Sequence, residues 1–426
     1  LNSSPFFKYY KWWNIQRFSS IKLKDLKSGE KMNVPKLRFK EFNNEWQSIN
    51  LADIFQYFST NSFSREQLSE SGILKNLHYG DIHRKYNSIV NENKEITSYV
   101  KDINYVNKYE LLKNNDLIFA DASEDHEGIG KAVEVVNVNN NTVSGLHTIL
   151  ARDNSNVFAP MFKGYYFNSP IVHNQIRVLA NGFKVYGISK EAINKLNIKI
   201  PSIKEQSKIA NTFYLLDKKI ELQSKKIEDL KLFKLYTKNQ IFKDYDEIFK
   251  LKDILVKWNK KNKNNYVKYV ESISNKYGFI SQSDQFEDRN VASKNLNNYY
   301  IIEKGVFGYN PSRLNVGSLA LKTNDKVSVV SPLYECFTTS QNKQYLLEWF
   351  NSKYFRKETI SKFEGGVRNT LNFSNLCEIE IGLPTIEKQN MYSRIFKIFN
   401  KKLTIEEEKL DKLFELKKGL LQSMFV

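Results

Sequence analysis

The chain repeats one segment of its own sequence, and this repeat limits the folds that it can adopt. The segment at 200–213 reads IPSIKEQSKIANTF, and a related segment at 383–396 reads LPTIEKQNMYSRIF. Pro201 returns as Pro384, 183 residues later, and the alignment continues without a gap as far as Phe425. A chain that carries the same long segment twice, each time after a long non-helical region, is built from two equivalent halves. We expect such a protein to bind something that itself has two halves.

Apolar residues recur in both copies at alternating steps of four and three. Polar residues interrupt the pattern at equivalent places, Gln223 and Lys234 in the first copy and Glu406 and Lys417 in the second. An apolar seam with a period of about 3.5 residues is typical of a helix that packs against a partner helix. Each helix would span roughly 40 residues, or about 60 Å. The predicted coiled-coil seam consists of Ile209, Phe213, Leu216, Ile220, Ile227, Leu230, Phe396, Phe399, Leu403, Leu410 and Leu413.

The shared register predicts that the two helices pair with each other. An antiparallel pair would relate the two halves of the chain by an approximate twofold axis. The alternative is that each helix is amphipathic and covers only the domain that precedes it. Matching registers in the two copies favour mutual pairing.

The two helix starts differ in their capping signals. Ser202 and Glu205 follow a proline and predict a capping box, in which a hydroxyl and a carboxylate bind early helix amides. The second copy has Thr385 as an N-cap candidate but Lys388 in place of the carboxylate. We therefore expect half of the box to be missing there.

Composition favours a polyanionic partner. The 426 residues include 65 Lys and Arg against 47 Asp and Glu, a formal charge of +18. The length suggests two to four domains, and no apolar run is long enough to span a membrane. Only two cysteines and five scattered histidines occur, so neither a disulfide framework nor a metal-ligand spacing is recognisable. A reducing, cytoplasmic location is the default expectation.

The chain divides into two mixed α/β regions, each closed by a long helix. In the first region the sequence predicts strands at 54–58 and 111–120 and a β-hairpin or strand-loop-strand at 133–145. In the second it predicts strands at 266–274 and 299–310 and helical spacing at 344–355. The expected divisions are a leader or extension at 1–33, then domains at 34–200 and 244–383, with helical regions at 201–243 and 384–426.

Recognisable catalytic motifs are missing from the sequence. Asn310-Pro311 lacks the second proline and the aromatic residue of an amino-methyltransferase motif. Gly130-Lys131-Ala132 lacks the glycine spacing and the hydroxyl of a phosphate-binding loop. We therefore expect a chain that binds rather than catalyses.

The arrangement resembles the DNA specificity (S) subunit of Type I restriction-modification systems. The strongest matches are IPSIKEQSKIANTF and LPTIEKQNMYSRIF with the helices that follow them, and the resemblance extends over 34–425. Further matches are SGLHTILAR in the first domain and KGVFGYNPSRLNVGSLAL, VVSPLYECF and GGVRNTLNFSNL in the second. The Pro-x-x-x-Glu-Gln pattern of the family is complete in the first copy, whereas Lys388 replaces the glutamate in the second.

The resemblance implies an α+β fold with two target-recognition domains separated by two long antiparallel coiled-coil helices. It implies a non-catalytic subunit that binds double-stranded DNA at a split site, one half per domain, with the helices acting as a ruler. Two modification (methyltransferase) subunits would dock on the helices and restriction/translocase subunits would join them. S-adenosylmethionine, ATP and Mg would be bound by those partners and not by this chain.

Loops that mix amides, cations and aromatic residues supply the expected base contacts. The candidate DNA-binding residues are Lys75, His78, Tyr79, Arg84, Lys85, Tyr277, Ser281, Gln282, Arg289, Arg313, Arg368 and Asn369. Beside the seam, charged residues such as Lys218, Lys219, Lys225, Lys226, Lys401, Lys402 and 406–409 are expected to meet a partner subunit or, equally, to form an ordinary solvated face.

Three other functions remain open on the sequence alone. The chain could be a coiled-coil adaptor or structural protein whose basic charge serves protein contacts. It could be an autonomous nuclease or methyltransferase with an unrecognised site, or a protein that binds RNA.

Overall fold

The computed structural model describes residues 18–20, 33–101, 109–139, 141–182, 184–274, 277–282, 295–316, 319–360 and 370–426. The chain forms two compact units. Unit 1 consists of Leu1–Ser224 together with Glu408–Val426, and unit 2 consists of Lys225–Glu407. Unit 1 is therefore built from two stretches of sequence that are separated by the whole of unit 2.

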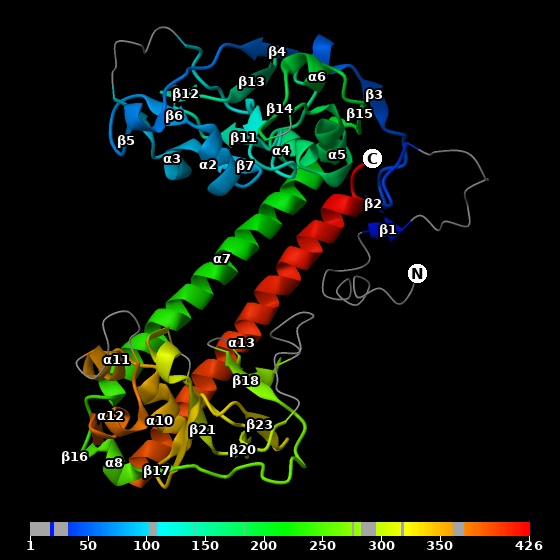
Figure 1. Ribbon diagram of the computed structural model, residues 1–426. Coiled ribbons are helices and arrows are strands. Elements are labelled where there is room, and N and C mark those ends of the chain that lie inside the picture. Colours follow the sequence, from blue (N-terminus) through cyan, green and yellow to red (C-terminus); the bar gives the residue numbers. More distant parts are fainter. Residues whose placement is uncertain are drawn as a thin grey trace. The chain divides into compact units, whose positions relative to one another are not determined.

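Unit 1 is organised around a five-stranded sheet with the strand order β4-β13-β9-β11-β7 (Figure 1). Its neighbours are antiparallel except for β7 and β11, which run parallel. The central strand β9 reads LIFA and is buried at all four positions, because the sheet is covered on both faces. The strands are β4 (Phe55–Phe58), β13 (Thr148–Asp153), β9 (Leu117–Ala120), β11 (Ala132–Val136) and β7 (Ile89–Asn91).

Smaller sheets and short helices complete unit 1. A four-stranded sheet has the order β12-β6-β8-β5, with β12 (Thr142–Ser144), β6 (Lys75–Leu77), β8 (Tyr99–Val100) and β5 (Leu68–Ser69). Two-stranded pairs join β1 (Phe18–Ser20) to β2 (Leu37–Phe39), β3 (Gln47–Ile49) to β15 (Ile198–Ile200) and β10 (Ala122–Ser123) to β14 (Tyr186–Gly187). The helices are η4 (Leu51–Asp53), η5 (Arg65–Gln67), α2 (Tyr79–Arg84), α3 (Glu92–Glu95), α4 (Phe162–Phe167), α5 (Pro170–Leu179), α6 (Lys190–Asn194) and the first part of α7 (Ile203–Ile241).

Unit 2 contains a four-stranded antiparallel sheet with the order β17-β24-β21-β22. These strands are β17 (Leu255–Lys257), β24 (Glu335–Thr339), β21 (Phe307–Tyr309) and β22 (Leu319–Leu321). Pairs join β16 (Glu247–Lys250) to β25 (Glu380–Leu383), β18 (Glu271–Ser274) to β19 (Gly278–Ser281) and β20 (Tyr300–Ile302) to β23 (Ser328–Val330). The helices are α8 (Leu251–Ile254), η7 (Pro311–Val316), α10 (Lys343–Phe350), α11 (Lys353–Ile360), α12 (Phe373–Cys377) and most of α13 (Ile386–Ser423).

The expected fold class is confirmed: the chain is mixed α/β with two long helices at the predicted places. The segment at 133–145 does form a strand, a loop and a strand, but the hairpin interpretation is wrong. β11 pairs with β9 and β7, whereas β12 pairs with β6 in a different sheet. None of the helices in the described part of the chain has the length and apolarity that crossing a bilayer requires.

Candidate nucleic-acid interface and helical seam

In unit 1 the two long helices run antiparallel and share one core. Phe213 of α7 stacks on Phe425, just after α13, with ring centroids 5.6 Å apart. Asp217, one turn further along α7, pairs with Lys417, two turns back along α13, at 2.5 Å. Both phenyl rings are almost fully buried among the aromatic side chains of α4. Burying two such rings stabilises unit 1 by about 2 to 3 kcal/mol each.

In unit 2 the later part of α7 meets the earlier part of α13 in the same direction. Lys226 pairs with Glu406 at 3.1 Å, and Lys234 donates to Asn400 Oδ1 at 2.6 Å. Phe242, just after α7, packs on Phe396 with centroids 5.9 Å apart. As the residue number rises along α7, the partner's number falls along α13. Glu406, expected at a partner-binding face, is instead buried in the seam by Lys226.

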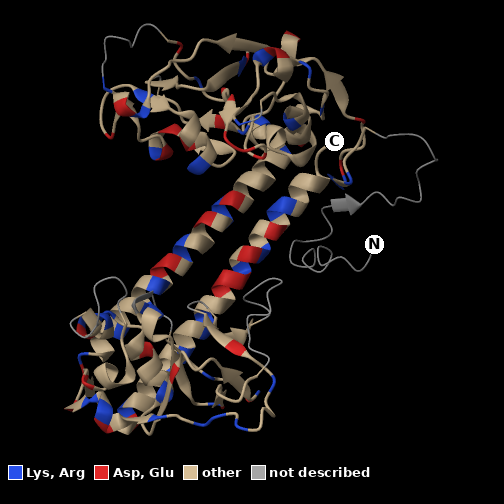
Figure 2. Ribbon diagram, in the orientation of Figure 1, with Lys and Arg blue, Asp and Glu red and all other residues tan. Residues whose placement is uncertain are grey.

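The predicted seam residues differ in their degree of burial. Ile209, Phe213, Leu216, Ile227 and Phe396 are buried, whereas Ile220, Leu230, Phe399, Leu403, Leu410 and Leu413 are partly buried. Charged side chains of both signs alternate along the remaining surface of α7 and α13 (Figure 2).

A buried glutamine attaches α7 to the core of unit 1. The Gln206 side chain accepts a hydrogen bond from Ala159 N at 2.9 Å and donates to Pro201 O at 3.0 Å. Ala159 lies directly before α4, so the glutamine ties the start of the long helix to the loop that positions that helix. The amide satisfies two buried backbone groups that would otherwise be costly to bury.

The same arrangement recurs in unit 2 at residues 183 positions later. The Gln389 side chain accepts from Asn342 N at 3.0 Å and donates to Pro384 O at 2.9 Å. Asn342 is the N-cap of α10, which corresponds to α4. The two helix starts are therefore equivalent in their contacts as well as in their sequence.

The capping-box expectation is half correct. Ser202 Oγ accepts from Glu205 N at 3.4 Å, but the Glu205 carboxylate does not return to the helix start. Both of its oxygens accept from the buried Arg38 guanidinium at 2.7 Å. A bidentate, buried guanidinium is a stronger partner for the carboxylate than a single amide.

Unit 2 uses the reversed charge at the equivalent position. Lys388 pairs with Asp246 at 3.2 Å and with Asp244 at 3.4 Å, and the Thr385 hydroxyl caps the helix by accepting from Lys388 N. The lysine that breaks the repeat in the sequence thus keeps an ion pair between helix start and preceding strand. The carboxylate and the cation have simply exchanged sides.

The polar interruptions of the seam form a network in each unit. In unit 1, Asp217 accepts from the Tyr165 hydroxyl at 3.0 Å and pairs with Lys417. Each of these three positions recurs 183 residues away in unit 2, where Asn400 lies between Glu348 and Lys234. Buried polar side chains of this kind fix the register and direction of a helix pair.

Short helix α2 carries most of the candidate DNA-binding residues of unit 1. Its N-cap is His78, whose Nδ1 accepts from Gly80 N at 3.1 Å. Burial and the nearby Arg65 lower the pKa of His78 to about 4, so the ring is neutral near pH 7. Tyr79 lies beside that ring, with centroids 4.7 Å apart. Arg84 is exposed at the end of the helix.

Two lysines of this region have different surroundings. Lys75 is buried in β6, donates to Glu92 O and pairs with the Glu92 carboxylate at 2.8 Å. It therefore supports the four-stranded sheet and does not reach the surface. Lys85 is exposed and donates to Thr97 Oγ1 at 2.8 Å.

Sequence reasoning did not select three further residues around α2. His147 lies 5.2 Å from the Tyr79 ring and contacts the Asp121 carboxylate at 3.3 Å. Its backbone has φ 54°, a left-handed conformation that orients the ring toward α2. Arg65 binds Asp81 of α2 at 2.7 Å while remaining half exposed. Only the match SGLHTILAR drew attention to the segment around His147.

We name His78, Tyr79, Arg84, Lys85, His147 and Arg65 the α2 surface. It combines phenol, imidazole and guanidinium groups, which can donate to phosphates and to base edges. Neither α2 nor the other described segments hold three or more His, Cys, Asp or Glu side chains in a metal-binding group.

In unit 2 the candidate residues lie on a hairpin and a 3₁₀ turn. Tyr277 is strongly exposed between β18 and β19, while Ser281 and Gln282 at the end of β19 are half-buried. Arg313 is exposed in η7, the turn that precedes β22. Arg289, Arg368 and Asn369 lie outside the described residues.

Comparison with known proteins agrees with this geometry. Residues 43–232 match the family called Type I restriction modification DNA specificity domain. These residues form a Type I restriction-modification DNA specificity domain. The resemblance inferred from the repeated segments is thereby confirmed.

Solved specificity subunits share the fold of the whole chain. A crystal structure of the S subunit of a Type I restriction-modification system from M. genitalium matches with a TM-score of 0.56 at 14% identity, over 92% of this chain and 99% of that one. A chain from a structural study of complex assembly and conformational transition of the type I R-M system matches with a TM-score of 0.55 at 13% identity, over 90% and 98% of the two chains. The likeness therefore includes unit 2 as well as the matched specificity domain.

Proposed function

We propose that this chain is the DNA-reading subunit of a Type I restriction-modification complex and that each unit recognises one half of a split DNA site. The observation that carries the proposal is the equivalence of the two units at their helix starts, where Gln206 and Gln389 make matching contacts. Two equivalent readers joined through paired helices suit a target with two halves. The charge of +18 suits the phosphate backbone of duplex DNA.

In unit 1 we propose that the α2 surface reads bases and phosphates. Tyr79, Arg84 and Lys85 offer side chains at the surface, while buried His78 fixes the start of α2. In unit 2 the same role falls to Tyr277, Gln282 and Arg313. Lys75 would act only by supporting the sheet next to α2.

A domain exchange tests the assignment of one half-site to each unit. Residues 46–199 would be replaced by the equivalent region of a related protein, and sequences bound from a randomised duplex library would be determined for both chains. We expect one half of the selected site to change while the other half stays the same. A change in both halves contradicts the proposal. Selection of no sequence at all would favour the coiled-coil adaptor.

We further propose that modification subunits dock on the exposed apolar positions of α7 and α13. Met391, Ile398 and Ile405 recur every seven residues on α13 and are 49%, 66% and 40% exposed. On α7, Leu215 and Leu222 are spaced in the same way and are 53% and 68% exposed. Such a second apolar stripe has no role in the seam and suits a protein partner.

Assembly with a purified modification subunit tests this docking. Replacing Ile398 by lysine should weaken the complex on gel filtration by at least tenfold, because a charge would be buried at the interface. Ile360 on α11 is equally exposed at 74%, so Ile360→Lys is the matched control and should assemble normally. Equal assembly of both variants would contradict the assignment of the stripe.

The chain itself is proposed to be non-catalytic. S-adenosylmethionine, ATP and Mg would be bound by the modification and restriction subunits. Incubating the purified chain with DNA and a labelled methyl donor should give no transfer, whereas addition of modification subunits should give it. Transfer by the chain alone would overturn this part of the proposal.

A further inference from the structure

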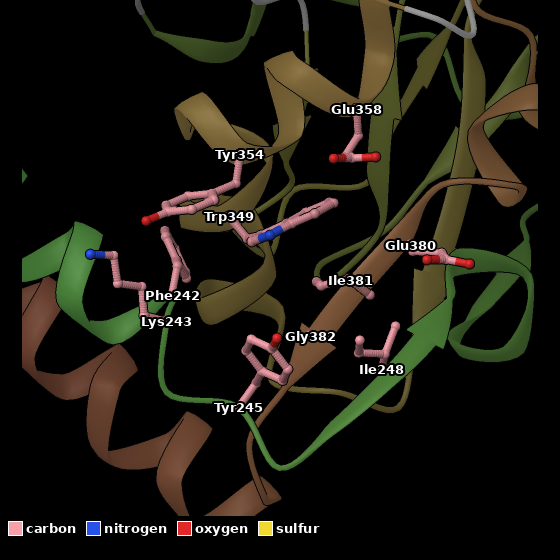
Figure 3. A pocket seen from close by; sticks show the side chains of 10 residues that line it. All are labelled: Phe242, Lys243, Tyr245, Ile248, Trp349, Tyr354, Glu358, Glu380, Ile381 and Gly382. Carbon is pink, nitrogen blue, oxygen red and sulfur yellow. The ribbon is translucent and has the colours of Figure 1, made fainter.

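Unit 2 has a pocket of about 440 Å³ beside the end of α7 (Figure 3). The rings of Phe242, Trp349 and Tyr354 gather on one side of it, and Tyr245 and Ile248 approach from the β16 side. The volume falls within the range of about 300–1,000 Å³ that is usual for ligand pockets. No described side chain fills it.

The equivalent position in unit 1 is filled by a tryptophan. Phe425 and Tyr166 lie 183 residues before or after Phe242 and Trp349, and both contact the indole of Trp46. The ring centroids are 6.2 Å and 6.5 Å from Trp46, and the two contacts are edge-to-face. Trp46 is only 1% exposed, so in unit 1 this space holds one indole.

Strand pairing explains why unit 2 lacks that indole. Ser48 pairs with Lys199 in unit 1, and Ile248 pairs with Gly382 in unit 2, which places Asp246 at the position of Trp46. Asp246 turns toward α13, where it accepts from Thr385 N at 3.0 Å and pairs with Lys388. The acidic residue that serves the reversed ion pair thus leaves the aromatic space open.

The rim of the pocket favours a protein ligand over a nucleotide. Glu358 and Glu380 contribute two carboxylates, against one amine from Lys243. Carboxylates repel a phosphate and attract a basic side chain beside an inserted ring. Tryptophan is also the residue most enriched at the centre of protein interfaces.

From the filled and open copies of this site we infer that the unit 2 pocket binds the aromatic side chain, a tryptophan by preference, of a partner protein segment with a neighbouring basic residue. The indole stacks among Phe242, Trp349 and Tyr354, and the basic residue meets Glu358 and Glu380. The site is separate from the α2 surface and from the apolar stripe of α13, and it does not depend on the proposed DNA reading.

Fluorine NMR on the full chain tests the inference. The probe is N-acetyl-5-fluorotryptophanyl-arginine amide, and its resonance should broaden when the chain is added. Ile248 is 57% exposed and lines the pocket, so Ile248→Trp should fill it and weaken probe binding at least tenfold. Val256 is 61% exposed on β17 and does not line it, so Val256→Trp is the matched control. Undiminished broadening with a folded Ile248→Trp chain would overturn the site.

Two further arms keep the inference testable. Replacing Glu358 and Glu380 together by glutamine should weaken the arginine-containing probe severalfold and leave N-acetyl-5-fluorotryptophan amide unchanged. An equal effect on both probes would contradict the role of the carboxylates. 2-Fluoroadenosine monophosphate should not broaden, and binding by it that Ile248→Trp abolishes would overturn the choice of a protein ligand. If Ile248→Trp fails to fold, the glutamine variant and the nucleotide arm decide the outcome.

Discussion

At the residue scale, the two units preserve functions of side chains more strictly than their identities. Glu205 and Lys388 occupy the same position of the repeat, yet one is a carboxylate and the other an amine. Each finds an opposite charge on the segment that precedes its unit's first strand, Arg38 in one case and Asp246 in the other. A substitution at either position must therefore be judged with its partner.

Reversing the charge of Glu205 should destabilise unit 1 strongly. Glu205→Lys leaves Arg38 buried beside a like charge, which we expect to cost about 3–5 kcal/mol in the free energy of unfolding. Adding Arg38→Asp should recover much of the loss, because it recreates the arrangement of unit 2. Urea unfolding of the single and double variants measures both effects.

The matched change in unit 2 should be mild. Lys388 and Asp246 are 38% and 48% exposed, so Lys388→Glu should cost no more than about 1 kcal/mol. Similar losses for Glu205→Lys and Lys388→Glu would contradict the view that burial decides the cost. Failure of Arg38→Asp to restore stability would contradict the proposed exchange of partners.

His78 should make unit 1 sensitive to acid. Its pKa is lowered to about 4 in the folded chain, against about 6.5 when unfolded, so the unfolded chain binds a proton first as the pH falls. Stability should decrease between about pH 6.5 and pH 4 and then stop changing on account of this group. We expect about 1–3 kcal/mol from His78.

Asparagine at this position keeps an N-cap acceptor without titrating near neutral pH. His78→Asn should therefore retain more stability than the parent chain at pH 4.5 and differ little at pH 8. Thermal unfolding at the two pH values measures this difference. An unchanged acid sensitivity would assign the effect to other groups.

The sequence predicted local features of these sites better than their partners. The heptad seam and the capping hydroxyl of Ser202 depend on residues within one or two helical turns, and both were recognisable. The Glu205 carboxylate was assigned to its own helix, whereas it binds Arg38, 167 residues earlier. Lys75 was taken as a surface cation, but the pairing of β6 and the position of α3 bury it against Glu92. Such contacts depend on tertiary packing that the local sequence does not contain.

At the scale of the element, each long helix supplies the core of the unit that follows or precedes it in sequence. α7 begins with Phe213 in the core of unit 1 and is followed by Phe242 in the core of unit 2. α13 reverses the order, with Phe396 in the core of unit 2 and Phe425 in that of unit 1. The helices are therefore structural parts of both units and more than connections between them.

Truncation of the two terminal phenylalanines should separate the units' stabilities. Phe425→Ala removes a ring that stacks on Phe213 and Tyr166, which should cost unit 1 about 3–5 kcal/mol. Phe242→Ala removes the equivalent ring from unit 2 and should cost a similar amount there. Hydrogen exchange of backbone amides reports each unit separately.

Faster exchange should appear in β9 and α4 for Phe425→Ala, and in β21 and α10 for Phe242→Ala. Uniform acceleration throughout the chain by either variant would mean that the two cores unfold as one. No acceleration would mean that the rings do not carry the cores.

At the scale of the whole molecule, the excess of 65 basic over 47 acidic residues is the property that governs association with DNA. Many of these charges already pair within a unit, as Arg38 and Lys417 do. The exposed cations Arg84 and Lys85 lie instead on the α2 surface. We therefore expect them to contribute to binding and not to folding.

The affinity for a duplex target should fall steeply as salt rises. The slope of log K against log salt decreases by about 0.9 for each phosphate contact that is lost. Arg84→Ala with Lys85→Ala should therefore reduce the slope by about 2 and leave thermal stability unchanged. Filter binding at several salt concentrations measures the slope.

Lys113 is the control for this measurement. Its side chain is 61% exposed, but it lies away from α2 and near Glu110. Lys113→Ala should leave the slope almost unchanged. An equal reduction by Lys113→Ala would show that the α2 surface has no special place in DNA binding.

The discontinuous make-up of unit 1 affects how the protein can be synthesised. Its core requires Leu420, Met424 and Phe425, and the ribosome adds these residues only after all of unit 2 has been translated. The growing chain must hold an unfinished first core, with the apolar face of α7 open, while the second core forms. A nascent chain in that state is a natural client for chaperones, and an interrupted translation product would expose that face to degradation.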